Sequence, residues 1–154
     1  MKILVVEDDE NKRVQIIEFL ASKHPSVDVK VASSLMAGVK CARSERPDII
    51  ILDMTLPNYD LREGESGGGM HAFGGVELLK QLRRHKVDSK VIVFTQFETF
   101  GLPPDMQDLP ELDKQLSEIY APQYLGAVYY HASRADWVPK LDELIAAAWP
   151  GDEV

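Results

Sequence analysis

The feature that most constrains the fold of this chain is an alternation of short apolar runs with segments whose apolar residues recur at helical spacing. Runs rich in β-branched residues lie at 3–6, 27–32, 48–53 and 91–95, and a fifth lies at 127–131. Near-continuous apolar strands are typical of a parallel sheet that is covered on both faces. The pattern predicts an α/β fold with a single, doubly wound, five-stranded parallel sheet and helices on both faces.

The segments between these runs have the spacing and the start signals of helices. Ser33 or Ser34 can cap a helix that runs through Ser44, and Pro47 then stops it. The apolar positions of the other expected helices are Val14, Ile17, Leu20 and Ala21, then Val76, Leu79 and Leu82, and finally Trp137, Leu141, Leu144, Ile145 and Ala148.

Length and charge exclude several classes of protein. A chain of 154 residues suits one domain, which we expect to span residues 1–154. The net charge of −8 would repel a phosphate backbone and an anionic membrane surface, so we expect neither direct nucleic-acid binding nor membrane binding. The single cysteine, Cys41, excludes a disulfide within the chain. The apolar stretch near the N-terminus is too short for a signal peptide or a membrane span, which predicts a cytoplasmic protein.

Polar residues follow three of the expected strands. Glu7 and Asp8 follow the first run, Asp53 ends the third and Thr95 ends the fourth. The carboxyl ends of parallel strands meet at one rim of the sheet, where such folds bind ligands. Carboxylates this close cannot all stay ionised cheaply, so the group predicts a hard divalent cation with oxygen ligands, for which Mg²⁺ fits best. Asp53 is the natural nucleophile for a phosphoryl group, and the Thr95 hydroxyl could donate to a phosphoryl oxygen.

Three motifs in this order resemble the receiver domain of two-component response regulators. They are "KILVVEDDE", "RPDIIILDMTLP" and "SKVIVFT", with about 45 residues from Asp8 to Asp53. The resemblance implies that Asp53 is the phosphoacceptor, Thr95 the switch hydroxyl and Tyr130 the aromatic switch. It also implies a Mg²⁺ site made by Glu7, Asp8, Asp53 and the backbone carbonyl of Thr55.

The same resemblance implies a function. The chain would be a stand-alone receiver that accepts a phosphoryl group on Asp53 from a histidine kinase or phosphotransfer protein and signals through protein–protein contacts. It would not be an enzyme beyond its own phosphorylation and dephosphorylation. Its partners would include a downstream protein, and a homodimer would form through the face of helix four, strand five and helix five.

The chain departs from the family pattern in its charge and in its loops. Ser133 stands where the family places a lysine that pairs with the phosphoryl group, and Arg134 either replaces that charge or is a surface residue. Insertions lie near 61–74 and 97–123. The second contains Pro103, Pro104 and Pro110, which we expect to prevent any helix before Glu111 and to leave 111–120 as helix four.

Two alternatives remain open from the sequence. The missing lysine favours a pseudo-receiver, which is a docking module that works without phosphorylation. A Mg²⁺-dependent phosphatase or nuclease is disfavoured. Such a phosphatase needs a second acid where Thr55 stands, and such a nuclease needs an Asp-x-Asp pair after a later strand, which is not found.

Overall fold

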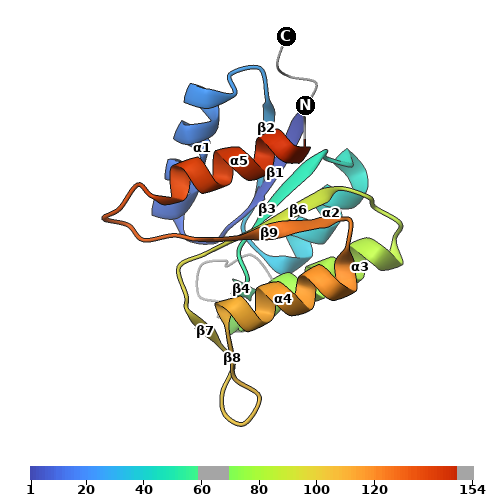
Figure 1. Ribbon diagram of the computed structural model, residues 1–154. Helices are drawn as coiled ribbons and strands as arrows, with labels where there is room; N and C mark the ends of the chain where they lie inside the picture. Colours follow the sequence, from blue (N-terminus) through green and yellow to red (C-terminus); the bar gives the residue numbers. More distant parts are fainter. Residues whose placement is uncertain (59–69, 149–154) are drawn as a thin grey trace, which may run out of the picture.

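A computed structural model describes residues 1–58 and 70–148 of the chain, and its centre is a parallel sheet (Figure 1). The strand order is β2-β1-β3-β6-β9. The strands are β1 (Lys2–Val6), β2 (Asp28–Ala32), β3 (Ile49–Leu52), β6 (Lys90–Thr95) and β9 (Tyr124–Tyr129). The prediction of a doubly wound, five-stranded parallel sheet is confirmed.

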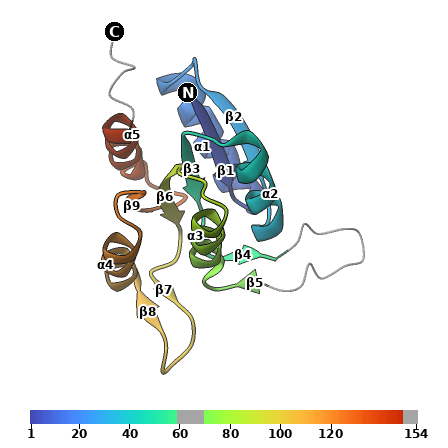
Figure 2. The ribbon, with the colours of Figure 1, turned by 90° about the vertical axis from the view of Figure 1, so that its right-hand side faces the viewer.

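Helices cover both faces of this sheet, as Figures 1 and 2 show. One face is covered by α1 (Glu10–Lys23) and α5 (Trp137–Ala148), and the other by α2 (Leu35–Glu45), α3 (Gly74–Arg84) and α4 (Leu109–Tyr120). The helix caps follow from local side chains. The hydroxyl of Ser34 accepts a hydrogen bond from the backbone of Ala37, so Ser34 rather than Ser33 caps α2.

The sheet separates two apolar layers because neighbouring side chains along a strand point to opposite faces. In β1, Ile3 and Val5 pack against α1 and α5, whereas Leu4 and Val6 pack against the helices of the other face. All four side chains are fully buried. A sheet buried on both faces leaves its polar residues at the strand ends, and the candidate site lies at one of those ends.

The described residues of the two expected insertions include short antiparallel strand pairs. Residues 61–69 of the first lie outside the described part of the chain. They connect β4 (Leu56–Pro57) to β5 (Met70–His71), which pair in antiparallel fashion. In the second, β7 (Thr99–Phe100) and β8 (Gln107–Asp108) form a small antiparallel hairpin that projects below α4 in Figure 1.

Two boundary predictions were wrong. The last strand occupies Tyr124–Tyr129 rather than 127–131, so Tyr130 lies directly after it. Helix four begins at Leu109 rather than at Glu111, because Pro110 sits in its first turn, where the backbone has no intrahelical donor to lose. The Asp108 carboxylate caps this helix by accepting a 2.8 Å hydrogen bond from the Glu111 backbone.

None of the helices within the described residues is long and apolar enough to cross a bilayer.

Candidate functional site

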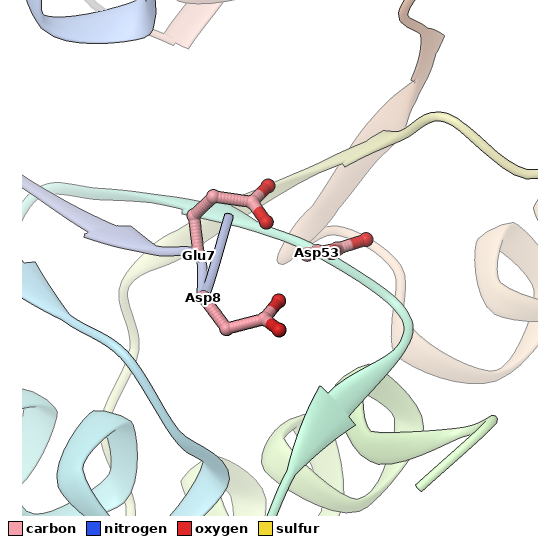
Figure 3. A group of neighbouring side chains, drawn as sticks. All are labelled: Glu7, Asp8 and Asp53. Atoms are coloured by element: carbon pink, nitrogen blue, oxygen red, sulfur yellow. The ribbon is translucent and has the colours of Figure 1, made fainter. Parts of the chain in front are cut away.

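The expected acidic group does assemble at the carboxyl end of the sheet. β1 and β3 are hydrogen-bonded neighbours whose last paired residues are Val6 and Leu52, so Glu7 and Asp53 leave the sheet side by side. The backbone N–H of Asp53 donates to the carbonyl of Val6 at 3.0 Å. One carboxylate oxygen from each of Glu7, Asp8 and Asp53 lies within 4.8 Å of the other two (Figure 3).

Two of these carboxyl groups are almost completely shielded from solvent. Glu7 is 1% exposed and Asp53 is 4% exposed. Burial raises the pKa of Glu7 to about 9, and the neighbouring charge of Asp53 adds to the shift. Burial also raises the pKa of Asp53, although the charge of Lys12 opposes this. In both groups burial is the main cause of the raised pKa, because it disfavours the charged carboxylate.

The principal cation of the pocket is Lys12, which sequence analysis missed. Its Nζ lies 2.7 Å from Glu7 Oε1 and 3.3 Å from Asp53 Oδ2, and its side chain is 1% exposed. Burial works against the charged ammonium, but the charges of Asp53 and Glu7 outweigh it, so the pKa of Lys12 is raised. The ammonium also lies 5.8 Å from the centre of the Phe94 ring.

The start of α1 explains why a lysine points inward here. The Asp9 carboxylate caps the helix by accepting hydrogen bonds from the backbone N–H groups of Asn11 and Lys12, at 2.9 and 3.4 Å. The buried face of the helix is Lys12, Ile16, Phe19 and Leu20, not the predicted face that begins at Val14, which is 42% exposed. The signal that could have found Lys12 is this spacing, since Lys12 precedes Ile16 by one helical turn.

One oxygen of Asp53 remains unengaged. Lys12 pairs with Oδ2, while the buried Oδ1 has no hydrogen-bond partner among residues 1–58 and 70–148. A buried carboxylate oxygen without a donor is costly in a merely structural role. It is suited to accept a bond from an incoming group.

Thr95 ends β6, as the sequence predicted, and Thr55 lies in the short segment between β3 and β4. Thr95 is fully buried at the end of β6, and its hydroxyl oxygen accepts a 3.1 Å hydrogen bond from the backbone of Phe97. Thr55 follows Asp53 by two residues, and its hydroxyl donates to the carbonyl of Ala72 at 3.3 Å. This bond ties the loop after β3 to the segment that leads into α3.

Tyr130 is buried, whereas its neighbour Tyr129 is 37% exposed. The Tyr130 ring packs against Phe94 and Trp137, with centroid distances of 5.3 and 5.9 Å. Its hydroxyl has no hydrogen-bond partner in the described part of the chain, and burial raises its pKa.

Relatives of the chain give this site a context. No protein-family model matches the chain. It is 40% identical to the uncharacterized protein y4jR of Sinorhizobium fredii over 138 residues. This match covers 89% of this chain and 91% of y4jR. It is 28% identical over 150 residues to the Detocs response regulatory protein DtcB of Enterobacter cloacae, covering 94% of this chain and all of DtcB. The chain belongs to the receiver-domain family of response regulators.

Solved structures of receivers agree with the fold. One is the receiver domain of a sensor histidine kinase from Pseudomonas aeruginosa, solved with a magnesium ion coordinated in its active-site cleft. It matches this receiver with a TM-score of 0.61 and 18% identity, over 97% of this chain and 98% of that chain.

The position of the family lysine is filled by Ser133, whose side chain contacts a residue of its own turn. In this receiver the Ser133 hydroxyl lies 2.9 Å from Nδ1 of His131, within the exposed turn after β9. Arg134 is also exposed, and its guanidinium forms no ion pair among the described residues. The expectation that Arg134 could supply the missing charge gains no support.

The donor set of this receiver fits Mg²⁺. Three carboxylates supply hard oxygen ligands of the kind that Mg²⁺ prefers, and within residues 1–58 and 70–148 the Lys12 ammonium is the one cation paired with them. A bound divalent cation would favour the charged forms of Glu7 and Asp53, whose pKa values burial raises. Glu7, Asp8 and Asp53 would hold the ion, with the backbone carbonyl of Thr55 as the further ligand that the resemblance implies.

Proposed function

We propose that this chain is a stand-alone receiver that accepts a phosphoryl group on Asp53 from a histidine kinase or a phosphotransfer protein. The observation that carries the proposal is the convergence of Glu7, Asp8 and Asp53 within 4.8 Å, with Oδ1 of Asp53 free of hydrogen bonds in the described structure. The proposal is supported by the similarity to DtcB, a response regulatory protein that the match covers over its whole length.

The residues of the pocket divide the chemistry between them. Oδ1 of Asp53 attacks the phosphorus atom, an acyl phosphate bond forms, and the bond from phosphorus to the donor's imidazole nitrogen breaks with its electron pair going to that nitrogen. The Thr95 hydroxyl donates to a phosphoryl oxygen. Mg²⁺, when bound, neutralises the charge that gathers on the phosphoryl oxygens. The activity is thus limited to the receiver's own phosphorylation and dephosphorylation.

The output surface in this proposal is the face formed by α4, β9 and α5. Tyr129, the last residue of β9, is 37% exposed there, which gives a downstream protein or a second copy of the chain apolar contact area. The partner is a protein in the cytoplasm, reached without direct contact to nucleic acid or membrane.

A second candidate is a docking module that works without phosphorylation. The observation in its favour is the exposed turn after β9, where Ser133 replaces the family lysine and Arg134 points to solvent. In that case, partner binding would be the same for wild type and for Asp53→Asn, with or without phosphodonor.

Intact-mass measurement separates the two. The protein is incubated with Mg²⁺ and acetyl phosphate, and wild type is expected to gain the mass of one phosphoryl group. Asp53→Asn should gain nothing, whereas Asp88→Asn, which changes an exposed aspartate in a loop, should behave as wild type. A wild-type protein that gains no mass while it still binds its partner is the docking module.

A further inference from the structure

We propose that Lys12 is the phosphoryl-binding cation of this receiver and that α1, rather than the loop after β9, supplies it. The inference rests on the proposed function, since it assigns a role at the same pocket. It starts from the position of the Lys12 ammonium, which bridges Glu7 and Asp53 inside the protein.

The Lys12 ammonium is the cation closest to the reacting carboxylate. Among residues 1–58 and 70–148, no other lysine or arginine nitrogen lies within 4.0 Å of an Asp53 oxygen. The neighbouring Arg13 is engaged elsewhere, because its guanidinium donates to the carbonyl of Glu7 and to the hydroxyl of Ser33 at 3.1 and 3.2 Å. Ser133 and Arg134 stay in the exposed turn.

The burial of Lys12 is too expensive to be incidental. Removing an ammonium from water costs several kcal/mol, by order of magnitude, and a buried ion pair rarely adds net stability over apolar residues of the same volume. The helix is already anchored by Ile16, Phe19 and Leu20, which occupy the same buried face. A charge kept at this position therefore points to a task other than folding.

The geometry leaves room for that task. Lys12 pairs with Oδ2 of Asp53, so Oδ1 can take the phosphoryl group while the ammonium stays beside the same carboxylate. A phosphoryl group brings about two negative charges at neutral pH next to Glu7 and Asp8. Lys12 is in place to offset part of that charge, and its four-carbon stem lets the ammonium follow a phosphoryl oxygen.

The test uses beryllofluoride, a phosphoryl mimic that needs no transfer step, together with acetyl phosphate, both at saturating Mg²⁺. Beryllofluoride affinity is measured by ¹⁹F NMR and the rate of phosphorylation by intact mass. The variants are Lys12→Met and Lys12→Gln, with Lys23→Met as the control, since Lys23 is an exposed lysine at the other end of α1. Circular dichroism identifies the variants that are folded.

We expect both Lys12 variants to lose beryllofluoride affinity at least tenfold and to phosphorylate at least tenfold more slowly, while Lys23→Met matches wild type. Adding Ser133→Lys to Lys12→Met should restore part of the loss, because it returns a cation from the family position. A folded Lys12 variant with wild-type affinity and rate would overturn the inference. A wild type that binds beryllofluoride but takes no phosphoryl group overturns the proposed function alone, and one that takes neither overturns both.

Discussion

The backbone N–H of Tyr130 donates a 2.8 Å hydrogen bond to the carbonyl of Thr95, which joins the residue that ends β6 to the residue that follows β9. The bond fixes the Tyr130 backbone beside the pocket. Its ring lies against Phe94, whose own ring faces the Lys12 ammonium. Tyr130 is therefore connected to the acidic site by packing and by its backbone, while its hydroxyl has no partner in the described structure.

The first prediction concerns this hydroxyl. Tyr130→Phe should change the free energy of unfolding by less than about 0.5 kcal/mol, because it removes no hydrogen bond. The matched comparison is Tyr124→Phe, since the Tyr124 hydroxyl lies 2.5 Å from Oδ1 of Asp113. That variant should lose about 1–2 kcal/mol. Urea unfolding measures both, and equal losses would show that Tyr130 has a partner in solution.

The second prediction is a pH dependence of the metal-free protein. Glu7 has a folded pKa of about 9 against an ordinary value of 4.5, so the native state holds a proton that the unfolded chain releases between these values. Stability in chelator should therefore fall as pH rises from about 5 to 9, and the Glu7 proton contributes at most about 1.4 kcal/mol per pH unit to this fall.

Replacing Glu7 tests the origin of that slope. Glu7→Gln should flatten it, because Asp53 then has Lys12 as its counter-ion without a competing carboxylate. Glu10→Gln, at an exposed position in the first turn of α1, should keep it. A wild type whose stability rises over this pH range would contradict the assignment to Glu7.

The third prediction concerns Mg²⁺. Binding to the native state alone should stabilise the protein, by about 1.4 kcal/mol when the free ion is ten times its dissociation constant. Asp8→Asn should remove most of this gain. Asp9→Asn is the matched control, because it deletes the same charge one residue away while asparagine still caps α1. Thermal unfolding with and without Mg²⁺ measures the effect, and a similar loss in both variants would indicate screening rather than a site.

The fourth prediction concerns the hairpin of β7 and β8. Phe100 is 2% exposed and its ring centroid lies 6.4 Å from that of Phe73, so Phe100→Ala should cost about 3–5 kcal/mol. Leu102, at the tip, is 81% exposed, and Leu102→Ala should stay within about 0.5 kcal/mol. Equal effects in urea unfolding would show that the hairpin is not anchored through Phe100.

The sequence alone determined the sheet and the meeting of the acids. Apolar β-branched runs separated by helical segments allow few arrangements other than a parallel sheet covered on both faces. Once β1 and β3 are parallel, Glu7, Asp8 and Asp53 must leave the sheet at the same rim. These features depend on local pattern and on strand direction, and both can be read along the chain.

Only the tertiary structure decided the contents of the pocket. A lysine in the first turn of a helix is ordinarily exposed. The inward position of Lys12 depends on where the Asp9 cap starts α1 and on how that helix is rotated against the sheet. The same limit applies to Pro110, because a proline is tolerated or not according to where the helix begins. It also applies to the start of β9, which local sequence did not locate. Helix rotation and strand ends are set by packing between segments far apart in the chain, which local sequence patterns do not encode.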